Sequence, residues 1–153
     1  MSAPKNHILP KNHILIVEAR FYPEIADQMK AGAVKVLEDR GYSYQVAEVP
    51  GALEIPAAVA FGAESGKFAG FIALGCVIRG ETSHYDHVST ESIRALQTLA
   101  VKKKLCLGTG ILTVENRGQA HARADQDKGN KGSSAAQACL AMISVRGGLL
   151  GQT

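Results

Sequence analysis

The sequence has only three cysteines, and they are poorly placed for a disulfide framework or a metal site. Cys76, Cys106 and Cys139 are an odd number, lie far apart and form no CxxC pair. Each belongs to an apolar stretch, which is typical of reduced thiols in a protein core. We therefore expect core thiols rather than disulfide bonds.

Charge of one sign and long apolar runs are also scarce. The 17 Lys and Arg residues against 14 Asp and Glu residues leave a formal charge of +3, too little for a nucleic-acid surface. The one basic run, Lys102–Lys104, is expected at the end of a helix, where cations complement the helix dipole. No apolar run approaches the roughly 18 to 20 residues of a membrane span, and the N-terminus is polar rather than signal-like. These features predict a soluble, cytoplasmic protein without nucleic-acid or membrane partners, while small anionic substrates stay possible.

A short direct repeat occupies the N-terminal region. The segment KNHIL occurs at 5–9 and again at 11–15, separated by Pro10. A five-residue repeat is too short for a solenoid, and Pro10 separates it from the first buried strand. The length of 153 residues is typical of one domain. We predict an extended N-terminal arm over residues 1–13 and a single domain over residues 14–153.

Buried strands and amphipathic helices alternate through the rest of the chain. Strands are predicted at 14–17, 44–49, 71–78 and 105–113, and helices at 23–41, 54–63, 85–101, 119–124 and 133–146, the last after a glycine-rich turn at 129–132. This alternation predicts parallel βαβ units with right-handed crossovers. The expected fold is α/β, a three-layer αβα sandwich around a four-stranded parallel, flavodoxin-like sheet.

Ligands of such sheets bind beyond the carboxyl ends of the strands, so the loops there are the candidate site. The four loops are 20–23, 50–54, 79–84 and 113–117. All carry polar or aromatic residues that a purely structural turn does not need: Arg20, Phe21, Glu54, Arg79, Glu81, Thr82, His84, Glu115 and Asn116. Their concurrence favours a functional site over four independent structural loops.

His84 is the strongest acid/base candidate among these residues. It follows a glycine-containing loop and precedes a helix, and an unperturbed imidazole titrates near pH ~6.5. The sequence His84-Tyr85-Asp86-His87 also allows a metal site, because residues three apart share a helix face. However, Asp86 is expected to point away from that face, and no further ligand set accompanies the two histidines. We expect no metal.

The sequence lacks the motifs of a serine nucleophile, a dinucleotide-binding loop and a Walker phosphate loop. There is no G-x-S-x-G elbow for a serine nucleophile, and Cys76 is expected inside a buried strand. Gly108-Thr109-Gly110 lacks the third glycine of a dinucleotide fingerprint, and Lys131-Gly132-Ser133 reverses the Walker order. The helix start within 129–134, beside Lys131, can hold a phosphate or be an ordinary helix cap.

Five motifs occur in order along the chain: RF at 20–21, VPGALEIP at 49–56, ALGCVIRGETxHYD at 73–86, GILTxEN at 110–116 and GNKG at 129–132. Together they resemble the 6,7-dimethyl-8-ribityllumazine synthases, over about residues 14–150. The resemblance implies condensation of 5-amino-6-(D-ribitylamino)uracil with 3,4-dihydroxy-2-butanone 4-phosphate, the penultimate step of riboflavin biosynthesis, with release of phosphate and water. These condensations proceed by proton transfers, so no cofactor is expected.

The resemblance also implies a role for each site residue. Phe21 stacks on the pyrimidine, Ala52, Leu53 and Glu54 hold the ribityl chain, and Cys76, Val77 and Ile78 offer backbone contacts to the heterocycle. Glu81 and Thr82 belong to the loop that takes the butanone phosphate, His84 carries protons, and Arg123 binds the phosphate. Each residue type suits its role: an aromatic for a flat ring, a carboxylate for hydroxyls, a guanidinium for phosphate.

The chain departs from the family pattern at one site position, and the resemblance also implies an oligomeric state. Thr109 stands where many members place an aromatic that covers the pyrimidine from the neighbouring subunit, which is expected to weaken ring binding by roughly 1 kcal/mol. The family forms pentameric rings with active sites between neighbours, so a homo-oligomeric ring of five is expected here.

Two other functions are weaker interpretations of the same pattern. A signalling receiver domain needs an acidic cluster at the ends of strands one and three, whereas Cys76–Ile78 end the third strand and only Glu18 is acidic near the first. A flavin- or lumazine-binding protein without activity would need neither a proton carrier nor a phosphate clamp. The presence of His84 and Arg123 therefore favours an enzyme.

Overall fold

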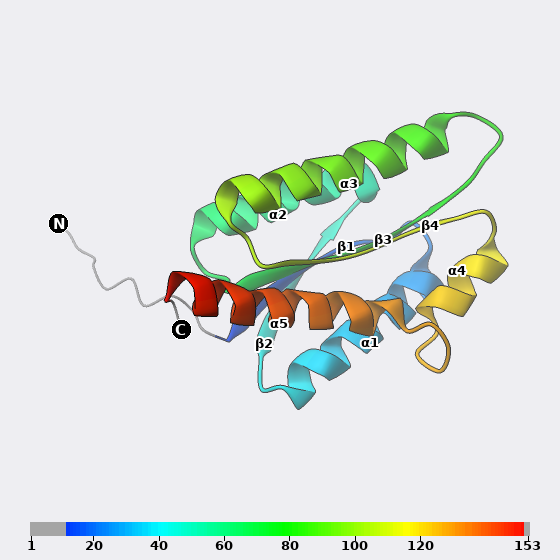
Figure 1. Cartoon of the computed structure of the whole chain (residues 1–153). Helices are drawn as coiled ribbons and strands as arrows, with labels where there is room; N and C mark the ends of the chain where they lie inside the picture. Colours follow the sequence, from blue (N-terminus) through cyan, green and yellow to red (C-terminus); the bar gives the residue numbers. More distant parts are fainter. Residues whose placement is uncertain (1–11, 152–153) are drawn as a thin grey trace.

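The computed structural model describes residues 12–151, so the predicted arm lies outside the described residues except for its last two positions. The order of elements is β1 (His13–Ala19), α1 (Pro23–Asp39), β2 (Ser43–Val49), the 3₁₀ turn η1 (Ala52–Glu54), α2 (Ile55–Ser65), β3 (Gly70–Ile78), α3 (His84–Lys103), β4 (Leu107–Val114), α4 (Arg117–Ala124) and α5 (Lys131–Leu150). Figure 1 shows a single sheet between two layers of helices.

The four strands form one parallel sheet in the order β2-β1-β3-β4. Because β1 pairs with both β2 and β3, the strand order reverses between β1 and β3, as in flavodoxin-like sheets. The helices α2 and α3 cover one face, and α1, α4 and α5 cover the other (Figure 1). The predicted three-layer αβα sandwich with a four-stranded parallel sheet is therefore confirmed.

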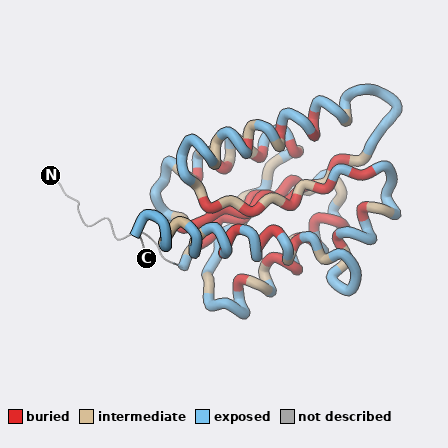
Figure 2. Tube along the Cα trace, viewed as in Figure 1, coloured by how far each residue is buried: buried red, intermediate tan, exposed pale blue. Residues whose placement is uncertain are grey.

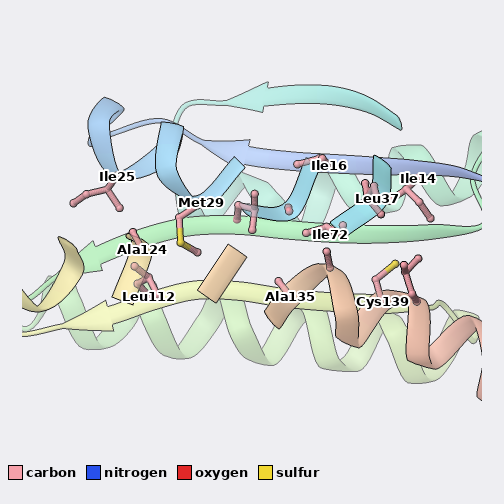
Figure 3. Packing of buried hydrophobic residues seen from close by; sticks show 14 of the residues in the cluster. Ile14, Ile16, Ile25, Met29, Leu37, Ile72, Leu112, Ala124, Ala135 and Cys139 are labelled. Atoms are coloured by element: carbon pink, nitrogen blue, oxygen red, sulfur yellow. The ribbon is translucent and has the colours of Figure 1, made fainter. Parts of the chain in front are cut away.

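The core is divided by the sheet into two clusters, because successive strand residues point to opposite faces. In β1, Ile14 and Ile16 pack against α1 and α5, whereas Leu15 and Val17 pack against α2 and α3. Figure 2 shows the buried positions concentrated in the sheet and along the inward faces of the helices, and Figure 3 shows the α1–α5 cluster from close by. Burial on both faces explains the continuous apolar run of β1.

Proline, glycine and charged residues near the helix ends determine where several helices begin and end. A proline in its first turn and Glu24 begin α1, and Gly41, with φ of 80°, follows its end. The basic run ends α3, with Lys102 and Lys103 in the last turn, as predicted. Most elements differ from their predicted bounds by one to four residues, and two of the starts are informative. β4 begins at Leu107 rather than 105, and α5 begins at Lys131 rather than 133, because Asn130 adopts the left-handed conformation (φ 48°) directly before the helix.

The first turn of α5 includes Gly132, which the sequence pattern predicts in the preceding turn. It lies against the backbone of α1, where a Cβ atom at this position would be 2.0 Å from the Met29 carbonyl oxygen. Only a residue without a side chain permits this approach of the two helices. None of the helices formed by residues 12–151 combines the length and hydropathy that a membrane crossing requires.

We expect Gly132→Ala to destabilise the protein, because the added methyl group must push α5 away from α1. Such overpacking costs about 1 to 3 kcal/mol, which lowers the thermal midpoint by about 3 to 10 °C in a chain of this size. Gly148→Ala is the matched control on the same helix, since a Cβ there meets nothing within 4 Å and alanine favours helix. Equal midpoints for the two variants would contradict the prediction.

Candidate functional site

Three of the four candidate loops meet at one cavity beyond the carboxyl ends of the strands. The cavity has a volume of about 340 Å³, and its lining comes from the ends of β1, β2 and β3 and from the start of α3. Its lining residues are Phe21, Tyr22, Pro50, Gly51, Ala52, Leu53, Glu54, Cys76, Val77, Ile78, His84 and Val88. The lining therefore includes most of the residues selected from the sequence.

Phe21 is the most exposed aromatic ring at the cavity, with 71% of the residue accessible to solvent. Its only aromatic neighbour among residues 12–151 is Tyr22, in an edge-to-face contact with ring centroids 5.0 Å apart. An edge-to-face contact leaves at least one face of each ring free for another flat group. Phe21 is therefore available to stack on a planar ligand rather than buried as loop packing.

Arg20, a candidate from the same loop, has a structural role instead. Its Nη1 lies 3.1 Å from Glu18 Oε1 and its Nη2 lies 2.6 Å from Asp27 Oδ1, which together raise the pKa of Arg20, the Asp27 hydrogen bond most of all. Lys30 Nζ lies 3.3 Å from the other oxygen of the buried Glu18. A buried carboxylate is stable only when it is paired, so these contacts fix the chain just before Phe21.

His84 is the first residue of α3 rather than the residue before it, and it lines the cavity. Its backbone N–H donates to Thr82 Oγ1 over 3.2 Å, so the loop and the helix start are joined locally. Glu81 and Thr82 are exposed and do not line the cavity in this structure. The imidazole is thus the one nitrogen base among the residues that line the cavity, which also include Glu54.

Cys76 is only half-buried, which corrects the prediction that it is a core thiol. Cys106 and Cys139 are buried and form no disulfide bond, as predicted. Cys76 is among the cavity-lining residues and also packs against the α1–α5 cluster, and desolvation raises the pKa of this thiol to about 11, against the smaller opposite effect of the nearby Arg117 charge. A thiol with this pKa is protonated near neutral pH and is a poor nucleophile.

Thr109 and Arg123 lie elsewhere. They line a second cavity of about 340 Å³, between β4 and the start of α5, together with Thr113, Lys131 and Ser134. Arg123 and Lys131 bring two positive charges to this cavity, and Lys131 stands in the first turn of α5, where the helix dipole also favours an anion. Within one chain, the cationic residues Arg123 and Lys131 therefore lie in a different cavity from His84 and Phe21.

The fourth loop also has a structural role, contrary to the expectation that all four loops meet. Asn116 Oδ1 accepts a hydrogen bond from the Gln119 N–H over 2.8 Å and caps α4, and Glu115 pairs with Arg79. Sequence reasoning missed Val88, which lines the first cavity from α3, because its helical spacing is that of an ordinary core residue. Among residues 12–151, no group of three or more His, Cys, Asp or Glu side chains is arranged to hold a metal ion.

Comparisons with known proteins agree in pointing to one family. The family model for 6,7-dimethyl-8-ribityllumazine synthase matches residues 11–146. The chain is 57% identical over 145 residues to the 6,7-dimethyl-8-ribityllumazine synthase of Bartonella bacilliformis, covering 93% of each chain. It is 56% identical over 139 residues to 6,7-dimethyl-8-ribityllumazine synthase 1 of Rhizobium meliloti, covering 88% of this chain and 91% of the relative. It is 53% identical over 143 residues to the enzyme of Agrobacterium fabrum, covering 90% and 97%.

The raised pKa of Cys76 predicts slow alkylation. At pH ~8 a thiol of pKa about 11 has roughly 100-fold less thiolate than one of pKa 9.0, and its higher intrinsic nucleophilicity offsets part of this, leaving a rate about tenfold lower. Iodoacetamide labelling of the Cys76 peptide, followed by mass spectrometry, should give a rate that still rises above pH ~10. The same peptide in denatured protein is the control, and a plateau near pH ~9 in the folded protein would contradict the prediction.

Proposed function

The chain belongs to the 6,7-dimethyl-8-ribityllumazine synthase family, and we propose that its two cavities are the two halves of that enzyme's active site. The enzyme condenses 5-amino-6-(D-ribitylamino)uracil with 3,4-dihydroxy-2-butanone 4-phosphate. It releases phosphate and water and forms 6,7-dimethyl-8-ribityllumazine, the penultimate step of riboflavin biosynthesis. The observation that carries the proposal is the convergence of Phe21, Glu54 and His84 on one cavity from three separate loops.

The first cavity binds the ribityl pyrimidine. The free face of Phe21 stacks on the ring, and base-on-aromatic contacts of this kind contribute roughly 1 to 3 kcal/mol. The backbone of Cys76, Val77 and Ile78 faces the heterocycle at the end of β3, while Glu54 and the neighbouring Ala52 and Leu53 meet the ribityl hydroxyls. A neutral Cys76 thiol fits this role, because a thiolate would compete with the pyrimidine amine for the ketone of the second substrate.

His84 moves the protons of the reaction. The amine adds to the ketone, phosphate is eliminated and the ring closes, and each step requires a proton to be taken up or released. An imidazole performs both near neutral pH, and its place at the cavity wall brings it to the bound substrates. The reactants are reactive by themselves, so orientation supplies much of the acceleration and His84 the remainder.

The second cavity binds the phosphate of the butanone substrate. Arg123 offers a planar guanidinium and Lys131 an ammonium group, and the start of α5 adds free backbone N–H groups. Glu81 and Thr82, on the loop before α3, line neither cavity of one chain and would approach the phosphate only from a neighbouring copy. Thr109 also lines the second cavity, so it stands on the side where a neighbouring chain would cover the pyrimidine.

A site divided between two different surfaces of one chain is completed by a head-to-tail contact between copies, and such contacts close into rings. The chain carries a suitable surface, an apolar groove between α3 and α5 beside the edge strand β4. Its exposed large apolar residues are Val101, Met142, Val145, Leu149 and Leu150. An exposed apolar patch of this kind is typical of an interface. We propose a pentameric ring, as in the family, and a cytoplasmic location, consistent with three unbonded thiols.

We expect Phe21→Ala to raise KM for the ribityl pyrimidine more than it lowers kcat, because the lost stacking acts before any bond forms. A loss of roughly 1 to 3 kcal/mol corresponds to about 5- to 150-fold in KM. Fluorescence of the lumazine product gives the rates. Phe61→Ala is the control, since Phe61 is as exposed (74%) but lies on α2 outside the cavity. An unchanged KM in Phe21→Ala would make Phe21 a packing residue.

Sharing of the site between neighbours predicts that two inactive variants rescue one another. His84→Ala and Arg123→Ala are unfolded together in equal amounts and refolded into mixed rings. An intact site forms where an Arg123→Ala chain supplies His84 and the neighbouring His84→Ala chain supplies Arg123. With random mixing, this occurs at about one quarter of the interfaces. Activity should therefore rise towards about a quarter of that of wild-type protein refolded in the same way.

The controls are each variant refolded alone, and native mass spectrometry, which verifies that mixed rings form. A site within one chain cannot recover in this way, because each chain then keeps its own defect. Mixed rings whose activity stays at the average of the two parents would refute the shared site. Parents as active as the wild-type protein would instead remove His84 and Arg123 from the reaction.

A further inference from the structure

Arg79 is a candidate of the sequence that lines neither cavity. Its backbone N–H donates to the Val114 carbonyl over 2.8 Å, so its main chain is fixed to β4 at the end of the sheet. After it the chain leaves the sheet through Gly80, where a Cβ would meet nothing within 4 Å, and reaches His84 through exposed residues. The side chain of Arg79 contacts residues at the start of α3.

One guanidinium makes three contacts there. Its Nε lies 3.2 Å from the Glu115 carboxylate, its Nη2 lies 3.5 Å from Asp86 Oδ1, and its Cζ lies 4.6 Å from the centre of the Tyr85 ring. Glu115 follows β4, whereas Tyr85 and Asp86 are the two residues directly after His84. The rigid planar fork of arginine suits such simultaneous contacts better than a lysine ammonium.

The first turn of α3 has little else to hold it. His84, Asp86 and His87 are exposed, Tyr85 is half-buried, and the first fully buried side chain is that of Val88. The N-cap residue, Ser83, makes no side-chain hydrogen bond to the helix, and Thr82 Oγ1 accepts only the N–H of the first residue, His84, over 3.2 Å. Weakly capped helix ends without burial fray, and a frayed turn would move the imidazole away from the cavity.

We infer that Arg79 is a positioning residue for His84, holding the first turn of α3 against the ends of β3 and β4 so that the imidazole faces the bound substrates. The inference rests on the proposed role of His84 as the proton carrier. Exposed ion pairs add little to global stability, so removal of Arg79 should affect the reaction more than folding. The proposed pyrimidine contacts of Phe21 and Glu54 lie on other loops, and those of Cys76–Ile78 come from the backbone of β3 rather than from the first turn of α3, so they should stay intact.

The test compares Arg79→Gln, His84→Ala and the double variant with the wild-type protein. Arg79→Gln should lower kcat about tenfold, as loss of a supporting contact commonly does, with KM for the ribityl pyrimidine within about twofold and an unchanged thermal midpoint. Arg79→Lys keeps the charge without the fork and should recover part of kcat. Arg94→Gln is the control, because Arg94 pairs with Glu91 on the exposed face of the same helix.

The double variant decides the mechanism. If Arg79 acts through His84, Arg79→Gln lowers kcat no further once His84 is alanine. If the two losses multiply, or if Arg79→Gln alone leaves kcat unchanged, the inference is wrong while the role of His84 stands. If His84→Ala itself leaves kcat unchanged, the proposed proton carrier fails and the inference fails with it. Should Arg79→Gln not fold, Asp86→Asn replaces it in the same cycle with the same expected non-additivity, since it breaks one of the same contacts.

Discussion

β1 is hydrogen-bonded along its length to β2 on one side and to β3 on the other, all in parallel, and its apolar residues are buried on both faces. The arrangement of the site depends on this pairing. Because the strands run in the same direction, their carboxyl ends lie at one edge, and loops separated by dozens of residues meet there. Phe21 follows β1, Glu54 follows β2 and His84 follows β3, so disruption of the β1 pairing would separate all three.

Much of this arrangement follows from the sequence, because parallel strands and their covering helices leave a regular apolar pattern. The strands and helices were predicted from that pattern, and their carboxyl ends then indicated where to search. The pattern contains no information on distances between side chains. It did not separate Phe21, which lines the cavity, from Arg20, which pairs with Glu18 and Asp27. Nor did it predict that α5 starts at Lys131, since this depends on a left-handed Asn130 and on the close approach of Gly132 to α1.

The roles of Arg123 and Cys76 show a second limit of sequence patterns. The placement of Arg123 in another cavity from His84 results from the path of α4 on the opposite side of the sheet from α3, which no spacing encodes. Cys76 lies in an apolar strand and was therefore assigned to the core. At the end of a strand, however, one neighbour is a cavity rather than a helix, so the same apolar run can end at a ligand.

The separation of charges within the chain has a chemical consequence. A phosphate-bearing substrate needs cations, yet the only fully charged lining group of the first cavity in the described residues is the carboxylate of Glu54. Under the proposed assignment, such a cavity would favour the neutral ribityl pyrimidine over a phosphate, and the cavity of Arg123 and Lys131 would do the reverse. If two copies bring these cavities together, each substrate has one preferred end, and the ketone then meets the amine in a single orientation. A reaction between two intrinsically reactive molecules gains most from such an orientation, so the proposed role of His84, at the wall of the first cavity, is limited to proton transfer.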